Sequence, residues 1–380
     1  MIAGILKEKA GEQRVSLVPE VVKQLIQQSV TVWVEPNAGA AAFYPDTAYM
    51  EAGALIKPAT EILQQADLIL SLQLPDTDVW KSIPDGKTLA GIYQPLYNAA
   101  LMEEAATRRL TLFSLDSIPR STRAQSMDVL SSQANIAGYK AVLLAAYTYG
   151  RYFPMFMTAA GSIAPAKVLV LGAGVAGLQA IATARRLGAV VEVFDTRPAV
   201  KEEVMSLGAR FVEVEGAADA SKAGGYAVEQ TEEYKRKQEE KIADSIAKAD
   251  IVITTAQIPG RKAPVLVSAS MLDRMRPGAV IVDLAAATGG NTVVTKDNST
   301  VTYKGITIIG NSNLAATMPA DASKLYARNM YNFLQLVIRN GQLAPDFQDD
   351  IVQGGCITHN GVIVNERVKA LLTSSAIINS

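Results

Sequence analysis

The chain has 380 residues, of which 49% are apolar and 19% are charged, and its formal net charge is −1. A chain of this length and composition is expected to fold into two domains with large apolar cores. The near-neutral charge, with no stripe of Lys and Arg, excludes a nucleic-acid partner, because such a partner requires basic groups that neutralise phosphates.

Over about the first 118 residues, short β-branched runs alternate with helix-like segments. The expected strands are 2–6, 30–34, 67–72, 89–93 and 110–114, and the expected helices are 18–28, 61–65 and 99–108. This alternation predicts a parallel α/β sheet. Residues 128–151 have apolar residues at roughly helical spacing and no proline, which predicts one long connecting helix.

A second α/β series begins at residue 167. The expected strands are 168–171, 190–194, 251–254, 279–284 and 306–309, with a helix at 175–187. An amphipathic helix is expected at 321–338, and the short tail after it is expected to pack back on one of the two domains. The fold class predicted is therefore α/β, with two doubly wound, Rossmann-like domains with parallel sheets, joined by long helices.

The insertion 213–250 differs from the rest of the chain in composition. Its segment 216–225 is small and flexible, whereas 229–248 has Glu and Lys at spacings that suit an exposed helix. The pattern therefore predicts a loop followed by a solvated helix.

The segment Gly172-Ala173-Gly174-Val175-Ala176-Gly177 follows an expected strand and opens an expected helix. In that context it is the fingerprint of a dinucleotide-binding turn, whose glycines allow the tight turn, the approach of the pyrophosphate and close helix packing. Asp195 ends the next strand and is placed to bind a ribose diol, which favours NAD(H) over NADP(H). Arg197 weakens that preference, and the alternative is a βα turn that only packs.

The loop 120–128 is polar and precedes the long helix. Ser126 and Asp128 could simply cap that helix. Gln125 could instead pair with a nicotinamide carboxamide, and a buried Arg120 would require a carboxylate such as Asp128.

Cys356 and His359 are the only residues of their kinds. They exclude an intrachain disulfide and a structural zinc site, so we expect no metal, and a single cysteine fits a reducing compartment. His359 is expected in a surface turn rather than in a catalytic site. No export signal is expected, and the apolar stretch 168–184 is too short and too interrupted by glycines for a membrane span.

These motifs resemble the alanine dehydrogenase and nicotinamide nucleotide transhydrogenase superfamily over nearly the whole chain. The segments that carry the resemblance are 7–8, 11–20, 120–128, 131–133, 138–139, 195–198, 254–260, 282–285 and 289–291.

Alanine dehydrogenases are expected to carry a lysine, a histidine and an aspartate that bind the substrate carboxylate and manage protons. At the corresponding places this chain has Gln73, no histidine in 91–96, and Ala287, so only Arg14 remains. The loop 120–128 instead resembles the NAD(H)-binding component, or alpha subunit, of proton-translocating transhydrogenase. That resemblance implies NAD(H) as cofactor and Re/Si-specific hydride transfer between two nicotinamides, which needs no general acid or base.

The resemblance also implies the residues of the site. The residues expected at the nicotinamide end are Arg120, Gln125, Asp128 and Ser131. The residues expected around the rest of the nucleotide are Ser121, Thr122, Arg123, Gly172, Gly174, Val175, Gly177, Asp195, Thr196, Arg197, Gly225, Tyr226, Gln238 and Gln257. Residues 224–226 fall in the expected mobile loop that closes over the nucleotide, or in a solvated surface loop.

The implied partners are an NADP(H)-binding component, a membrane component that couples transfer to proton movement, and a second copy of the chain in a homodimer. The first domain is expected to be discontinuous, 1–127 with 321–380, and the second to span 128–320. The expected place is the cytoplasm, at the inner membrane through the partner subunits. The alternatives are an amino-acid dehydrogenase of the alanine type and an NAD(H)-sensing module.

Overall fold

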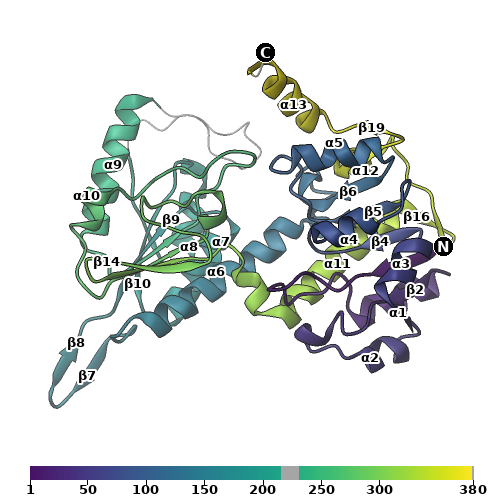
Figure 1. Ribbon diagram of the computed structural model, residues 1–380. Coiled ribbons are helices and arrows are strands. Elements are labelled where there is room, and N and C mark those ends of the chain that lie inside the picture. The colour runs from purple at the N-terminus through teal and green to yellow at the C-terminus, as the bar shows by residue number, and fades with distance from the viewer. Residues whose placement is uncertain (215–230, 379–380) are drawn as a thin grey trace. The chain divides into compact units, whose positions relative to one another are not determined.

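The computed structural model describes residues 1–214 and 231–378 and divides into two compact units (Figure 1). The first unit is made of Met1–Gln133 and Ala316–Ser380, and the second of Ala134–Ala315. Each unit has its own large sheet and its own buried apolar clusters.

The first unit contains an eight-stranded sheet in the order β19-β18-β6-β5-β4-β1-β2-β3. Its strands are β1 Ile2–Ile5, β2 Thr31–Val34, β3 Leu55–Ile56, β4 Leu68–Leu70, β5 Thr88–Gly91, β6 Thr111–Ser114, β18 Cys356–His359 and β19 Val362–Ile363. Its helices are α1 Pro19–Gln27, α2 Asp46–Glu51, α3 Ala59–Gln65, α4 Thr77–Ser82, α5 Ala99–Thr107, α11 Pro319–Val337, α12 Asp350–Gly355 and α13 Glu366–Ile378. The strands β1 to β6 pair in parallel, as the alternation of runs predicts.

The C-terminal segments complete the core of this first unit. The helix α11 buries Tyr326 and Phe333 fully, and the Phe333 ring lies 5.4 Å from that of Phe113 on β6. Strand β18 then pairs antiparallel with β6, where Cys356 lies opposite Phe113. The tail is therefore an integral part of the first sheet.

The second unit contains a seven-stranded sheet in the order β11-β10-β9-β12-β13-β15-β14. Its strands are β9 Lys167–Leu171, β10 Val190–Phe194, β11 Arg210–Phe211, β12 Ile251–Thr254, β13 Val280–Asp283, β14 Ser299–Tyr303 and β15 Ile306–Gly310. Its helices are α7 Val175–Arg186, α8 Lys201–Ser206, α9 Glu232–Ile246 and α10 Ala269–Leu272, and α6 Val129–Thr148 begins in the first unit and continues in the second. A separate hairpin, β7 Phe156–Thr158 with β8 Gly161–Ile163, projects from this unit (Figure 1).

The order of the second sheet determines where a ligand would bind. From β9 the chain proceeds to β10 and β11 on one side, and then returns to β12 on the other side of β9. In open α/β sheets such a switch point opens a crevice at the carboxyl ends of the two strands, where ligands bind. A ligand is therefore expected after Leu171 and after Thr254.

The predicted parallel pairing holds for most of both sheets but does not extend to their edges. Strands β14, β18 and β19 are antiparallel. β14 has a largely exposed polar sequence, Ser-Thr-Val-Thr-Tyr, because it lies at an edge and needs no apolar run. The elements α2, α4, β3 and the β7–β8 hairpin were also not predicted, because they are short and have little periodicity. In the described part of the chain, none of the helices combines the length and apolar character that crossing a membrane requires.

Candidate dinucleotide-binding site

The glycine-rich turn lies between β9 and α7 and requires its glycines. Gly172 has φ +105°, and a Cβ there would lie 2.5 Å from Oγ1 of Thr255. A Cβ on Gly177 would lie 1.9 Å from the carbonyl oxygen of Gly172, so the helix can approach the strand only without a side chain at this position. Gly174 caps α7 and faces open space, which leaves the first N–H groups of α7 accessible to an anion. The turn therefore fits a pyrophosphate.

The helix α6 packs on α7 beside this turn. A Cβ on Gly138 would lie 2.1 Å from the carbonyl oxygen of Ala176, so the two helices approach at the first turn of α7. The side-chain amide of Asn135 donates to Oε1 of Gln179 at 3.2 Å. The start of α7 is thus held from two sides, by the strand and by α6.

The loop after β12 contacts the same turn. Oγ1 of Thr255 donates to the carbonyl oxygen of Gly172 at 3.1 Å. The buried side chain of Asn291 holds the next residue, because its Nδ2 donates to the carbonyl oxygen of Ala256 at 2.9 Å and its Oδ1 accepts from the N–H of Ala256 at 3.1 Å. The buried carboxylate of Asp283 in turn accepts from the N–H of Asn291 at 2.6 Å. A hydrogen-bonded network thus connects the carboxyl ends of β9, β12 and β13.

Asp195 follows β10 at the same edge and is 8% exposed. Its carboxylate accepts from the N–H of Ala173 in the glycine-rich turn at 2.7 Å. It also forms an ion pair with Arg197, whose Nη2 lies 2.7 Å from Oδ2. The acidic residue expected to bind the ribose is therefore tied directly to the phosphate-binding turn.

The other residues expected around the nucleotide take different positions. Val175 begins α7 and is 38% exposed, and Thr196 is half-buried beside Asp195. Gln257 is exposed, and its amide donates to the carbonyl oxygen of Leu284 at 2.8 Å. Gln238 lies half-buried on α9. The expected loop residues Gly225 and Tyr226 lie outside the described residues.

The loop 120–128 belongs to the first unit, and its conformation is set by the contacts it makes there. The side-chain amides of Asn329 and Asn332 on α11 donate to the carbonyl oxygen of Ser126 at 2.8 and 2.9 Å. The guanidinium of Arg123 donates to both carboxylate oxygens of Asp349, at 2.6 and 2.8 Å, and also contacts Asp350. Arg123 therefore fastens the loop to the start of α12.

Asp128 caps α6. Its Oδ1 accepts from the N–H of Ser131 at 2.9 Å and its Oδ2 from the Ser131 hydroxyl at 2.6 Å. Both carboxylate oxygens therefore serve the start of the helix. Arg120 is exposed, so the requirement for a carboxylate that a buried arginine would have does not arise from burial here. Thr122 and Gln125 are also exposed, and Ser121 is half-buried.

Arg14 forms a buried cluster that the sequence pattern does not predict. Its Nε and Nη2 donate to the two carboxylate oxygens of Glu12 at 2.8 and 2.7 Å, and its Nη1 donates to Oε1 of Gln133 at 2.7 Å. Gln73 donates to the same Glu12 at 3.0 Å. Burial raises the pKa of the neighbouring Glu8 to about 8. The charge of Arg14 is therefore matched by this chain's own carboxylate.

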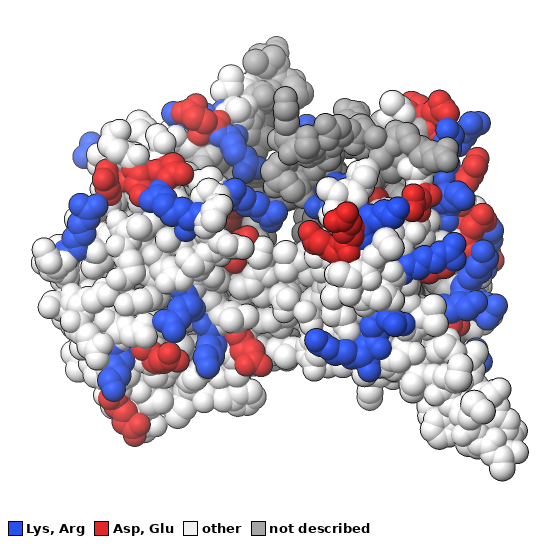
Figure 2. Space-filling view, turned by 180° about the vertical axis from the view of Figure 1, so that it is seen from behind, with Lys and Arg blue, Asp and Glu red and all other residues white. Residues whose placement is uncertain are grey.

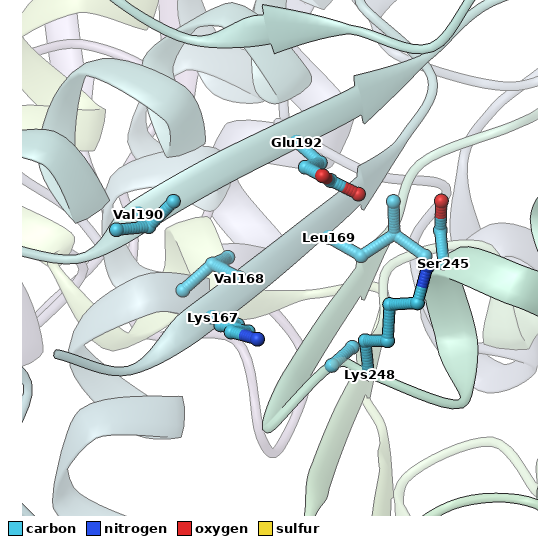
Figure 3. A pocket seen from close by; sticks show the side chains of 8 residues that line it. Lys167, Val168, Leu169, Val190, Glu192, Ser245 and Lys248 are labelled. Carbon is cyan, nitrogen blue, oxygen red and sulfur yellow. The ribbon is translucent and has the colours of Figure 1, made fainter. Parts of the chain in front are cut away.

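A small pocket in the second unit is unrelated to this site. It measures about 80 Å³ and is lined by side chains that include Lys167, Val190, Glu192 and Lys248 (Figure 3). These residues belong to the amino ends of β9 and β10 and to the segment after α9, so the pocket lies at the edge of the sheet opposite to the glycine-rich turn. Pockets that bind ligands commonly measure about 300–1,000 Å³, so this one is too small for a dinucleotide.

His359 ends β18 and is half-buried. Its Nδ1 lies 3.1 Å from the hydroxyl of Thr111, and its ring lies 4.4 Å from that of Phe347. Partial burial lowers the pKa of His359, which favours the neutral imidazole.

The sheet order, the glycine-rich turn and Asp195 together define a dinucleotide-binding α/β protein. Residues 4–137 match the family described as alanine dehydrogenase/PNT, N-terminal domain, and residues 141–366 match its C-terminal domain. The chain belongs to the alanine dehydrogenase/PNT family. The resemblance inferred from the motifs, the α/β fold class and NAD(H) as the cofactor are thereby confirmed.

Within this family the chain is similar to transhydrogenase subunits. It is 45% identical to the first part of NAD(P) transhydrogenase subunit alpha from Rhodospirillum rubrum, over 94% of this chain and 96% of that protein. The crystal structure of transhydrogenase from Sinorhizobium meliloti matches with a TM-score of 0.88 and 45% identity, over 96% of this chain and 100% of that one. An alanine dehydrogenase of Staphylococcus saprophyticus is 28% identical over 99% of this chain and 98% of that protein, and is the more distant of these relatives.

Proposed function

We propose that this chain is the NAD(H)-binding component of a proton-translocating transhydrogenase of the Re/Si-specific type. It would hold NADH so that hydride passes directly to NADP⁺ on a partner component, with a membrane component that couples the transfer to proton translocation. The similarity to transhydrogenase alpha subunits supports this function.

The observation that carries the proposal is the pairing of Arg14 with Glu12. An alanine-type dehydrogenase shares the nucleotide-binding fold, so the fold alone does not separate the two functions. Arg14 is the one substrate-binding candidate that the sequence retains, and Glu12 already holds it through two hydrogen bonds. A substrate carboxylate would have to displace a carboxylate whose side chain is only 1% exposed, and would leave that buried charge without its arginine.

When bound, NADH supplies the hydride, and the reaction produces no alkoxide or imine that must be protonated. The residues of this chain therefore have to position the nicotinamide ring, and they do not have to exchange protons with it. We propose that Gly172, Gly174, Val175 and Gly177 hold the pyrophosphate through the backbone and the start of α7. The residues proposed to line the rest of the nucleotide site are Asp195, Thr196, Arg197, Gly225, Tyr226, Gln238 and Gln257.

At the nicotinamide end we propose Gln125 as the residue that pairs with the carboxamide, because its amide is exposed on a loop that is fixed from both sides. Asp128 and Ser131 would act on the nicotinamide end indirectly, by fixing the start of α6. Arg120 would contribute its exposed charge. Ser121 and Thr122 belong to the same loop and would contact the nucleotide from it. Arg123 is better explained as a positioning residue, since its guanidinium is held by Asp349.

The proposed homodimer would use the β7–β8 hairpin. The exposed apolar side chains of the hairpin and of the segment just before it are Tyr152, Met155, Phe156 and Met157, and the rings of Tyr152 and Phe156 stack at 4.9 Å. The hairpin forms the uncharged projection in Figure 2, and an isolated two-stranded ribbon of this kind is at best marginally stable in water. A second copy would cover these side chains. Sedimentation of Met157→Glu should then show a monomer at concentrations at which the unchanged protein is a dimer.

The function is tested by mixing the chain with the NADP(H)-binding component of a transhydrogenase and following reduction of a spectrally distinct NADP⁺ analogue by NADH in a stopped-flow instrument. Rapid transfer that requires both proteins supports the proposal. NADH binding without transfer would favour an NAD(H)-sensing module. The control reaction is the chain alone with alanine and NAD⁺. Formation of NADH in that reaction would favour the alanine-type dehydrogenase. The proposed place at the cytoplasmic surface of the inner membrane is checked separately, by cell fractionation.

A further inference from the structure

The acceptor positions of the Asp195 carboxylate are occupied by hydrogen-bond donors of this chain. Oδ2 accepts from the N–H of Ala173 at 2.7 Å and from Nη2 of Arg197 at 2.7 Å. Oδ1 accepts from the backbone N–H of Arg197 at 2.8 Å and from its Nε at 2.8 Å. A carboxylate offers about four positions for hydrogen bonds, and four donors occupy them here.

A ribose diol that binds Asp195 needs two of these positions. The two backbone donors cannot leave without a change in the glycine-rich turn or in the chain after β10. The guanidinium of Arg197 can leave by rotation about its side-chain bonds, and the 18% exposure of that side chain gives it a route toward solvent. The diol and the guanidinium therefore compete for the same face of Asp195.

We infer that Arg197 is a specificity-determining residue that closes the ribose-binding face of Asp195 and must be displaced by the nucleotide. The inference rests on the proposed function only in requiring that the chain binds a dinucleotide here. With NADH, the displacement is a cost in affinity, because the diol replaces hydrogen bonds that the carboxylate already has. With NADPH, the displaced guanidinium offers a partner to the 2′-phosphate, which would otherwise meet Asp195 as a like charge.

The two nucleotides should therefore respond in opposite directions when the guanidinium is removed. In Arg197→Met the stem is retained and the charge is lost. NADH should bind more tightly, by about fivefold, because the diol no longer has to displace the guanidinium from Asp195. NADPH should bind more weakly, by about tenfold or more, because it loses a charge-assisted partner.

The experiment is titration of the full chain with NADH and, separately, with NADPH by isothermal calorimetry. Arg210→Met serves as the matched control, since it removes the same charge from β11 in the same unit, where Arg210 is 80% exposed and contacts Glu192. Both dissociation constants should stay within about twofold in that control, a difference below 0.5 kcal/mol or so. Arg197→Lys keeps the charge without the planar fork and should retain most of the NADPH affinity while it releases Asp195.

Opposite shifts of the two dissociation constants in Arg197→Met support the inference. Equal weakening of NADH and NADPH, in a variant with an unchanged melting temperature, would overturn it, because Arg197 would then contact a part common to both nucleotides. A second result would also overturn the inference: both Arg197→Met and Arg197→Lys melt at a lower temperature and bind NADH more weakly. The ion pair would then be purely structural. If the unchanged protein binds no NADH, the proposed function fails first.

Discussion

Replacing Gly138 with alanine should destabilise the second unit, although alanine is the better helix former. In an open helical position this change stabilises by about 0.5–1 kcal/mol. Here the new Cβ would lie 2.1 Å from the carbonyl oxygen of Ala176, 2.8 Å from its carbonyl carbon and 3.0 Å from its Cα. All three are backbone atoms, so no side-chain rotation relieves the overlap, and α6 must move from α7 by about 1 Å.

Overpacking of this kind costs about 1–3 kcal/mol, so after the gain in helix propensity the net loss in free energy of unfolding should be about 1 kcal/mol and at most about 2.5 kcal/mol. Because Ala176 lies in the first turn of α7, the movement also displaces the N–H groups that face the pyrophosphate. The dissociation constant for NADH should therefore rise along with the loss of stability.

Urea unfolding gives the first quantity, and titration of NADH fluorescence gives the second. Gly150→Ala is the matched control, because Gly150 follows the same helix and a Cβ there would meet no atom within 4 Å. That variant should match the unchanged protein in both assays. If Gly138→Ala is as stable as the control and binds NADH equally well, the close approach of α6 to α7 is not what holds the turn, and the reasoning fails.

Three further changes probe other parts of the site. Asn291→Ala should lower the free energy of unfolding by about 2–3 kcal/mol in urea titrations, because the N–H of Ala256 loses its buried partner; a loss below about 0.5 kcal/mol would contradict that role. Gln125→Asn should slow hydride transfer, measured by stopped flow, far more than it weakens NADH binding, and equal effects would exclude the proposed pairing with the carboxamide. Burial raises the pKa of Glu8 from its ordinary 4.5 to about 8, so the folded chain keeps a proton that the unfolded chain releases. Stability should therefore fall as pH rises between about 4.5 and 8, and Glu8→Gln should flatten this dependence in melts at a series of pH values; an unchanged slope would refute it.

The parts of the site that the sequence predicted are those that local geometry determines. Gly172, Gly177 and Asp195 fall in a strand–turn–helix–strand order that requires these residue types, and the structure places them at one edge of one sheet. The sequence also left two roles open for Asp128, a helix cap and a contact to the nucleotide site, because either role would use the same carboxylate. The hydrogen bonds to Ser131 show the cap, and the role toward the nucleotide remains a proposal.

The missed features join residues far apart in the chain. Arg14 meets Gln133, and Arg123 meets Asp349, across more than a hundred residues in each case. Periodicity reports only which face of an element is buried, so it could not predict these pairs. Asn291 is a similar case: its side chain holds the loop of another strand, and only the resemblance of the segment around it hinted at a role.

The path of the chain also determines the order in which the protein can be completed during synthesis. The ribosome delivers the chain from its N-terminus, and domains generally fold as units as they emerge. All strands of the second sheet are present once residue 310 has emerged, whereas the first sheet still lacks β18, which lies between β6 and β19. Until then the Phe113 side of β6 also lacks Phe333. We therefore expect the first unit, whose synthesis starts first, to complete its folding last. Its nascent form is then the one that needs protection from aggregation.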